Sequence, residues 1–200
     1  EIDESDLIVV WGGNPVNTQV NVMTHVSRAR KQRGAKLVVV DPYRTGTAEA
    51  ADLHLMLKPG TDGALVAAII HVLFAEGLAD RAYMAKYADA PDALEAHVRT
   101  RTPEWAETIT GVPADAIRDF ARLYGRTRRA FIRVGFGFSR SRNGSASLHA
   151  VSCLPTVTGA WQYKGGGALY SNRSIYHLDN STITGLEMKD PSVRSLDQCR

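Results

Sequence analysis

Cysteine is scarce in this sequence, with only Cys153 and Cys199 among 200 residues. The two lie far apart and match no spacing of metal-binding cysteines, which predicts two unpaired thiols. No apolar run comes near the ~18 residues that a membrane-spanning helix needs. Residues 1–6 are acidic and polar, and a strand-like run follows directly, so we expect no signal peptide in this stretch. The compartment stays open between the cytoplasm and the periplasm.

A large excess of charge of one sign is also missing. The 24 Lys and Arg residues face 21 Asp and Glu residues, and the apolar fraction of 44% is typical of a soluble globular chain. The main local bias is the segment 122–142, which carries seven arginines and no acid. The mild net charge of +3 and the absence of a recognition motif argue against a nucleic-acid-binding module, even with Phe136 and Phe138 among these arginines.

The most informative stretch is LIVVWGGNPVNT, residues 7–18. Its first four residues are apolar and mostly β-branched, which predicts a strand buried on both faces. Gly12 and Gly13 allow the backbone to bend and to approach a ligand, and Asn14 adds a side-chain amide. A predicted helix follows at once and points its free N–H groups at the turn, which favours an anion pocket. The alternative is a structural turn with Trp11 in the core.

Strand-like and helix-like segments alternate along the chain. Strands are predicted at 7–10, 36–40, 53–57 and 130–134, and helices at 18–33, 63–76, 80–88, 92–98, 103–110, 113–124 and 145–158. This order is typical of an α/β fold with an open, mostly parallel Rossmann-like sheet and helices on both faces. We expect one domain over residues 1–167, with a helical insertion at about 80–125, and an irregular tail over residues 168–200.

Polar, glycine-bearing loops follow all four predicted strands: WGGNP, DPYRT, KPGTD and GFGFSRSRNG. Ligands of such sheets bind outside the carboxyl ends of the strands, so these loops are candidates for one shared site. Asp41 ends the second strand, where α/β proteins often place an acid on ribose hydroxyls. Arg44 and Thr45 can add a charge and a hydroxyl. The alternative is a capping Asp41 and a solvated Arg44.

Asp62 has two possible roles in the third loop. Its carboxylate can cap the helix that follows, or it can accept hydrogen bonds from a base edge. Guanine presents two neighbouring donors, its ring N–H and its amino group, and one carboxylate can accept from both, whereas adenine presents no such pair. Asp62 facing the base therefore predicts a guanine nucleotide. In the fourth loop, Arg140 and Arg142 are candidates for binding a pyrophosphate, because arginine pairs bidentately with phosphate.

Several motifs together resemble one enzyme family. They occur in the order DLIVVWGGNP, GAKLVVVDPYRT, AADLHLMLKPGTDGAL, ITGVPADAIRDFAR, GFGFSRSRNG, LPTVTGAW and GGGALYSN. In order and spacing, over about residues 6–173, this set is similar to the central part of the molybdopterin oxidoreductases. These enzymes form the dimethyl-sulfoxide-reductase superfamily and carry a bis(molybdopterin guanine dinucleotide) cofactor with molybdenum or tungsten.

The resemblance implies a set of cofactor-binding residues. Trp11 to Thr18 would surround one guanine dinucleotide, with Asn14 at its phosphate or ribose, and the loop from Phe136 would lie near the other pterin half. The implied residues are Trp11, Gly12, Gly13, Asn14, Thr18, Asp41, Arg44, Thr45, Gly60, Asp62, Phe136 and Arg140. Gly60 and Asp62 would hold the guanine, in agreement with the carboxylate argument. Arg173 follows the GGG loop near the place of a metal-adjacent arginine in formate-dehydrogenase-like members, and a surface arginine is the alternative.

The resemblance also implies what this sequence lacks. It contains neither the cysteine motif for an iron–sulfur cluster nor the protein ligand to the metal, which family members carry further upstream. We therefore expect an oxidoreductase middle domain that has no turnover by itself. Its implied partners are the remaining domains of the same catalytic subunit, with iron–sulfur or electron-transfer subunits beyond them.

Two other hypotheses remain open at the level of sequence. An NAD- or FAD-type Rossmann domain shares the acid after the second strand, but the first turn is Gly12-Gly13-Asn14-Pro15 rather than G-x-G-x-x-G, and Pro15 lacks an N–H. A non-catalytic interaction or scaffold domain is the other, and the intact loop chemistry counts against it.

Overall fold

The computed structural model describes residues 1–171, 179–194 and 196. The chain divides into two compact units, residues 1–170 and residues 171–200. Residues 168–170, which the sequence analysis assigns to the tail, therefore belong to the first unit. In the second unit the described elements are α10 (Ser181–Thr184) and a 3-10 turn (Leu186–Met188).

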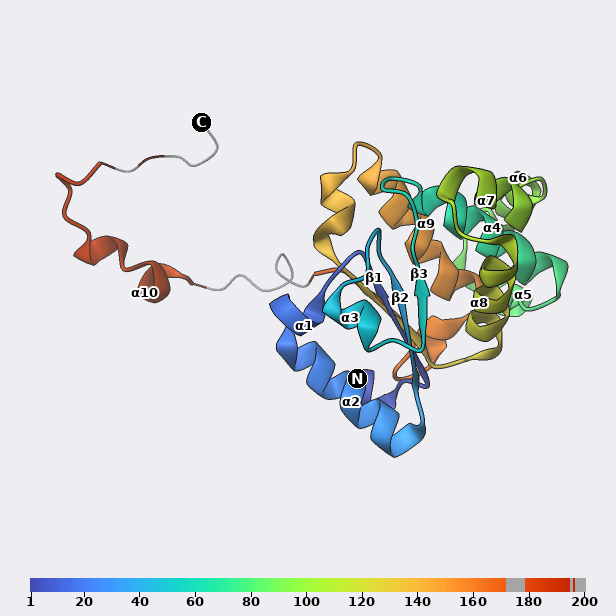
Figure 1. Cartoon of the computed structure of the whole chain (residues 1–200), viewed down its shortest axis with the longest axis horizontal. Coiled ribbons are helices and arrows are strands. Elements are labelled where there is room, and N and C mark those ends of the chain that lie inside the picture. The colour runs from blue at the N-terminus through green and yellow to red at the C-terminus, as the bar shows by residue number, and fades with distance from the viewer. Residues whose placement is uncertain (172–178, 195, 197–200) are drawn as a thin grey trace. The chain divides into compact units, whose positions relative to one another are not determined.

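A five-stranded sheet forms the centre of the first unit (Figure 1). All strand pairs are parallel, in the order β3-β2-β1-β4-β5, so the predicted α/β fold class is confirmed. The strands are β1 (Leu7–Trp11), β2 (Lys36–Val40), β3 (Leu53–Leu55), β4 (Ala130–Val134) and β5 (Gly167–Leu169). The prediction of four strands is wrong, since the sheet has a fifth strand, β5. The sequence gives no sign of β5, because it has only three residues and no apolar periodicity. The third strand ends at Leu55 rather than at Leu57.

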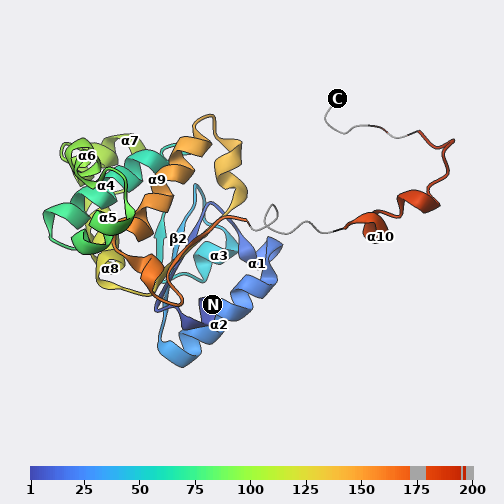
Figure 2. The same ribbon diagram turned by 180° about the vertical axis from the view of Figure 1, so that it is seen from behind.

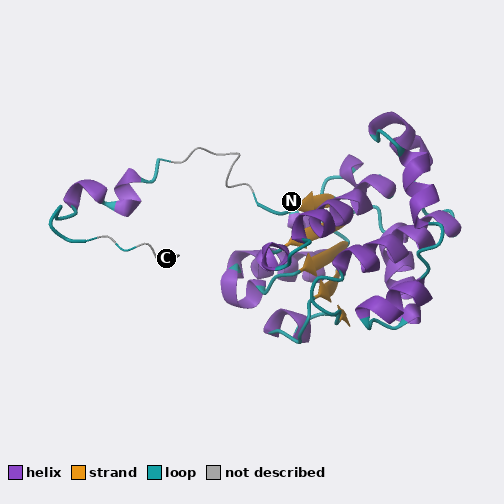
Figure 3. Ribbon diagram, turned by 90° about the horizontal axis from the view of Figure 1, so that it is seen from above, coloured by secondary structure: helices purple, strands orange, loops and turns teal. Residues whose placement is uncertain are grey.

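Helices cover both faces of this sheet (Figures 2 and 3). Alternate β1 residues enter different layers: Val9 belongs to the larger core, with α4, α8 and α9, and Val10 to the smaller core, with α2 and α3. Every residue of β1 is buried. This double burial explains the continuous apolar run of the strand.

The helices agree with the predicted segments to within a few residues at most ends. Those of the first unit are α1 (Pro15–Thr18), α2 (Val20–Arg33), α3 (Gly46–Glu49), α4 (Asp62–Ala75), α5 (Arg81–Tyr87), α6 (Pro91–Val98), α7 (Pro103–Thr110), α8 (Ala114–Arg126) and α9 (Gly144–Val157). The predicted helix at 18–33 is observed as α2, and the short α1 precedes it, separated by Gln19, where the sequence predicts no helix before residue 18. Short 3-10 turns lie at Ile2–Glu4, Phe136–Arg140 and Ala160–Gln162.

The helix α4 is apolar nearly all round and lies in the larger core, where it contacts α7, α8 and α9. Among the described residues, no helix combines the length and the apolar character that crossing a membrane requires.

The strand order determines where a ligand can bind. The neighbouring strands β1 and β4 send their following helices to opposite faces, α2 to the smaller core and α9 to the larger one. A crevice forms at the carboxyl ends of two strands whose connections diverge in this way. The predicted site residues follow from these strand ends.

Candidate functional site

The loops that carry the predicted site residues lie at one edge of the sheet. Because all strands are parallel, the segments after β1, β2, β3 and β4 share the carboxyl edge. These segments hold Trp11 to Thr18, Asp41 to Thr45, Gly60 to Asp62, and Phe136 to Arg140. Arg173 lies outside the described residues, so its predicted position has no structural counterpart here.

Backbone contacts join the first loop to the fourth. The amide of Gly135 donates to the carbonyl of Trp11 at 2.7 Å, and the amide of Gly137 donates to the carbonyl of Gly12 at 2.9 Å. A Cβ added at Gly135 would lie 2.2 Å from the carbonyl oxygen of Gly12. These glycines therefore allow two loops to pack together.

This packing gives a different reason for glycine at positions 12 and 13. A Cβ on Gly13 would lie 3.2 Å from the Cα of Gly135, and one on Gly12 would lie 3.3 Å from the ring of Phe138. The sequence analysis explains Gly12 and Gly13 by close approach to a ligand, whereas the structure shows close approach to the fourth loop. Gly12 also has a φ of +66°, which favours glycine.

The first loop also joins the third through two side chains. The indole N–H of Trp11 donates to Oδ1 of Asp62 at 2.8 Å. Trp11 is fully buried, and its side chain therefore acts on the site through this N–H rather than through an exposed ring. Asp62 is the first residue of α4, and Thr61 is the N-cap. The pKa of Asp62 is raised, because burial outweighs the hydrogen bonds from Trp11 and from its own amide.

Asn14 joins the first loop to the helix after β2. Its Oδ1 accepts from the hydroxyl of Thr47 at 2.7 Å, so its side-chain NH₂ points away from this bond. The hydroxyl of Thr18 donates to the carbonyl of Asn14 at 3.0 Å. Thr47 is fully buried and was missed in the sequence analysis, where nothing distinguishes it from other threonines at helix starts.

Asp41 lies nearly buried at the end of β2. Its Oδ1 accepts from the amide of Tyr43 at 3.3 Å. Burial raises its pKa and outweighs the lowering by the Tyr43 amide and by His54, and Asp62 adds a further upward contribution. The two carboxylates are therefore close enough to influence each other. Thr45 caps α3 by accepting from the amide of Ala48 at 3.2 Å, and Arg44 is exposed.

The third and fourth loops contact each other as well. The side-chain NH₂ of Asn143 donates to the carbonyl of Gly60 at 2.9 Å, and Gly60 has a φ of +78°. Asn143 lies in the arginine-rich loop but is not among the site residues predicted from the sequence. Phe136 is half exposed, and its ring packs against that of Tyr170 with centroids 5.1 Å apart.

This edge has the donors that an anionic nucleotide needs. The amides of Gly13 and Asn14 donate to no described residue, and both residues are partly exposed. The exposed cations along the same edge are Arg44, Lys58, Arg140 and Arg142, and none forms an ion pair with a described residue. Free amides and arginines suit phosphate oxygens, and the carboxylates of the buried Asp41 and the partly exposed Asp62 suit base or ribose donors. The residues present therefore fit a phosphate-linked nucleotide.

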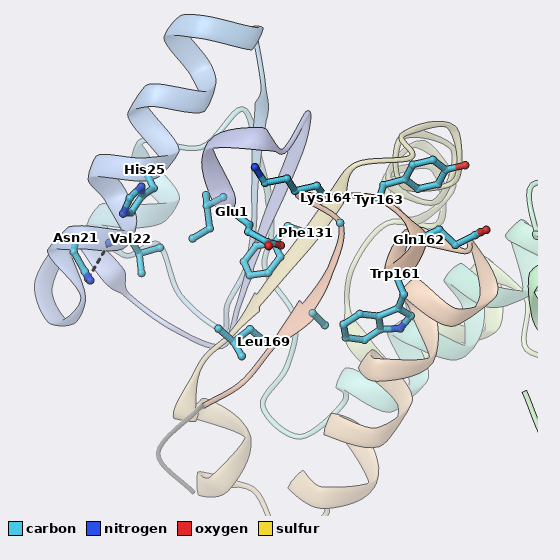
Figure 4. Close-up of a pocket in the computed structure, with 13 residues that line it drawn as sticks. Glu1, Asn21, Val22, His25, Phe131, Trp161, Gln162, Tyr163, Lys164 and Leu169 are labelled. Carbon is cyan, nitrogen blue, oxygen red and sulfur yellow. Dashed lines mark hydrogen bonds between the residues drawn. The ribbon is translucent and has the colours of Figure 1, made fainter. Parts of the chain in front are cut away.

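A separate cavity of about 650 Å³ lies elsewhere in the first unit (Figure 4). Side chains of Val22, His25, Phe131, Trp161 and Leu169 are among those that line it. None of the predicted site residues does. The candidate site is therefore the loop edge rather than this cavity.

The described residues contain no group of three or more His, Cys, Asp or Glu side chains placed to bind a metal ion. Cys153 is a free thiol, as predicted, and burial raises its pKa. Cys199 lies outside the described residues.

Comparisons with known proteins agree on one family. The family model described as molybdopterin oxidoreductase matches residues 1–199. The sequence is 38% identical over 183 residues to "Probable oxidoreductase YoaE" of Bacillus subtilis, which covers 92% of this chain and 27% of that protein. It is 38% identical over 159 residues to "Formate dehydrogenase H" of Escherichia coli, which covers 80% of this chain and 22% of that protein.

A solved structure has the same fold. "Acetylene Hydratase from Pelobacter acetylenicus" superposes with a TM-score of 0.76 and 28% identity, covering 84% of this chain and 23% of that one. The chain thus spans about a quarter of the length of the proteins that it matches.

Proposed function

This chain belongs to the molybdopterin oxidoreductase family, and we propose that it is the cofactor-binding middle domain of a molybdenum or tungsten oxidoreductase catalytic subunit. Its role is to hold the guanine dinucleotide part of a bis(molybdopterin guanine dinucleotide) cofactor. The loop edge that contains Asn14, Asp41 and Asp62 is the binding surface.

One observation carries this proposal. Loops that are far apart in sequence contact one another through specific bonds: Trp11 with Asp62, Asn14 with Thr47, and Asn143 with Gly60. The loops are therefore held in one arrangement before any ligand binds. A preordered site loses less conformational freedom on binding than a set of mobile loops.

Residues of different charge would bind different parts of the nucleotide. The free amides of Gly13 and Asn14, with Arg140 and Arg142, bind phosphate oxygens. Asp41 accepts from ribose hydroxyls, and Asp62 accepts from the ring N–H and the amino group of guanine. Phe136 contributes an exposed aromatic ring near the second pterin half. When bound, the metal and its dithiolene ligands supply the redox or oxygen-atom-transfer chemistry.

The reaction depends on parts of the protein outside this sequence. The chain spans 27% of one relative and 22% of another, and the relatives' names include a formate dehydrogenase and a hydratase. Different reactions on one fold indicate that the substrate is chosen elsewhere. We expect the metal ligand and any iron–sulfur cluster in the remaining domains of the same subunit, which are the partners of this chain. The 200 residues alone should show no metal-dependent turnover.

Binding of GDP and ADP to the 200-residue chain tests the proposal. GDP carries the base, ribose and diphosphate that the loop edge would hold, and calorimetry measures both affinities. We expect GDP to bind more tightly than ADP by tenfold or more. Equal affinities, or tighter binding of ADP, would favour an NAD- or FAD-type site. If neither nucleotide binds, the proposal is wrong and a non-catalytic scaffold domain is favoured.

A further inference from the structure

The bond between Trp11 and Asp62 joins two parts of the chain that are 51 residues apart in sequence. Trp11 is the last residue of β1, and Asp62 is the first residue of α4. The indole ring of Trp11 is fully buried, and its contact with Phe138 fixes it further, with ring centroids 6.5 Å apart. The donor therefore has one position, which is set by the sheet and the core.

Asp62 has an alternative partner within its own helix. A carboxylate in the first turn of a helix can turn back to the free amides there. The side chain of Thr61, the N-cap, makes no capping bond, so these amides are not occupied by it. The carboxylate accepts from its own amide at the start of α4, and the Trp11 N–H fixes Oδ1 at a second point, outside the helix.

The bond leaves acceptor capacity on Asp62. An ionised carboxylate has about four lone-pair sites. The indole N–H occupies one of them and the amide of Asp62 another, which leaves about two. Oδ2 accepts from no side chain among the described residues, and Asp62 is partly exposed. Two donors of a ligand can therefore still bind the carboxylate while Trp11 keeps its bond.

We propose that Trp11 is the residue that positions Asp62 for base selection, so that its buried indole N–H determines the preference for guanine over adenine. This inference rests on the proposed function, and it adds a residue that contacts no ligand itself. Without the N–H, the carboxylate is held only by its own amide, so it can rotate and presents no fixed pair of acceptors. Selectivity is then lost while phosphate binding by the other loops persists.

The variant Trp11→Phe tests this directly, because it retains a large ring and removes only the donor and part of the ring area. Trp161→Phe is the matched control: Trp161 is 46% exposed, its N–H donates to Thr156 at 3.3 Å, and it lies in the separate cavity (Figure 4). Calorimetry with GDP and ADP gives the affinity ratio for each protein. We expect Trp11→Phe to lower the GDP-to-ADP ratio by tenfold or more, and Trp161→Phe to leave it unchanged.

A second readout separates positioning from a general loss of packing. The pKa of Asp62, measured from its carboxyl ¹³C resonance, should rise in Trp11→Phe, because the Trp11 N–H favours the ionised form. A loss of packing alone would weaken GDP and ADP equally and leave the affinity ratio unchanged. That outcome would overturn the inference.

A measurement on the unaltered chain covers the case in which Trp11→Phe does not fold. The indole ¹H–¹⁵N resonance of Trp11 should shift with the ionisation of Asp62 and on addition of GDP, and that of Trp161 should do neither. A Trp11 resonance that shifts neither with the ionisation of Asp62 nor on addition of GDP would overturn the inference and leave the proposed function unaffected. Failure of the unaltered chain to prefer GDP would instead overturn the proposed function.

Discussion

The side-chain oxygen of Asn14 lies 2.7 Å from the hydroxyl oxygen of Thr47, which connects the loop after β1 to the helix after β2. The same hydroxyl accepts from the amide of Val16 at 3.2 Å. Thr47 is fully buried, and both bonds are partly buried. The hydroxyl of Thr47, with a longer 3.4 Å bond from its amide, therefore orients the Asn14 side chain at the candidate site.

Replacing Thr47 by Val should weaken both folding and binding. The two side chains have similar shape, but the Val16 amide loses its partner and Oδ1 of Asn14 keeps only the long 3.4 Å bond from the amide of residue 47. This loss costs about 1–3 kcal/mol in the free energy of unfolding. Urea unfolding and GDP titration measure the two effects. The control is Thr24→Val, because Thr24 is exposed and its hydroxyl makes only a long 3.4 Å bond within α2. Equal stability and GDP affinity in the two variants would contradict this account of Thr47.

Gly135 should tolerate no side chain. A Cβ there would meet the carbonyl oxygen of Gly12 at 2.2 Å, so Gly135→Ala forces the first and fourth loops apart. We expect a loss of about 1–3 kcal/mol or more in stability, together with loss of GDP binding. Gly46→Ala is the control, because its added Cβ would lie at an ordinary 3.5 Å from Val16. A stable Gly135→Ala protein with unchanged affinity would show that the loops need not touch.

The carboxyl groups at the edge predict a pH dependence of stability. Burial raises the pKa of Asp41 and of Asp62 in the folded chain. Between the ordinary pKa and the raised one, the folded chain binds more protons than the unfolded chain, so the free energy of unfolding falls as pH rises through that range. Asp41→Asn removes one of these groups. Its stability relative to the unaltered chain should therefore increase as the pH rises from about 4 through the raised pKa of Asp41, as measured by urea unfolding. A constant or decreasing difference would contradict the prediction.

Asp62→Asn separates stability from recognition. The amide oxygen can still accept from Trp11, and the charge that burial disfavours is gone, so the variant should be at least as stable at neutral pH. Its NH₂ would face the donors of guanine, and losing hydrogen bonds to a charged group costs about 1.5–3 kcal/mol, roughly a tenfold to hundredfold loss in GDP affinity. Calorimetry tests this, and undiminished GDP binding would exclude Asp62 from base recognition.

The sequence was sufficient for the parts of the fold that depend on local pattern. Continuous apolar runs such as KLVVV predict buried parallel strands, and these are the strands observed as β1 and β2. The predicted strand at 130–134 is observed as β4, in which buried and partly buried residues alternate. The strand β5 could not be predicted, because Gly167–Leu169 forms a strand only by pairing with β4. The same holds for the break at Gln19, which no glycine or proline marks.

The sequence places the candidate site residues at one edge of the sheet, but the contacts between their loops could not be predicted. Parallel strands with polar ends already place Asn14, Asp41 and Asp62 at one edge. The bonds of Trp11 and Asn143 involve partners 51 and 83 residues away, and one sequence has no signal for such pairs. The function of Gly13 was likewise assigned to a ligand, since its neighbour Gly135 belongs to a distant loop.

The most direct test of the central claim is an amide ¹H–¹⁵N NMR titration of the 200-residue chain with GDP. We predict shifts at residues 12–14, 41–45, 60–63 and 136–143 that saturate together with one dissociation constant, and much smaller shifts with ADP. Shifts confined to a single loop, or gathered around the cavity of Figure 4, would contradict a shared nucleotide site at the edge of the sheet.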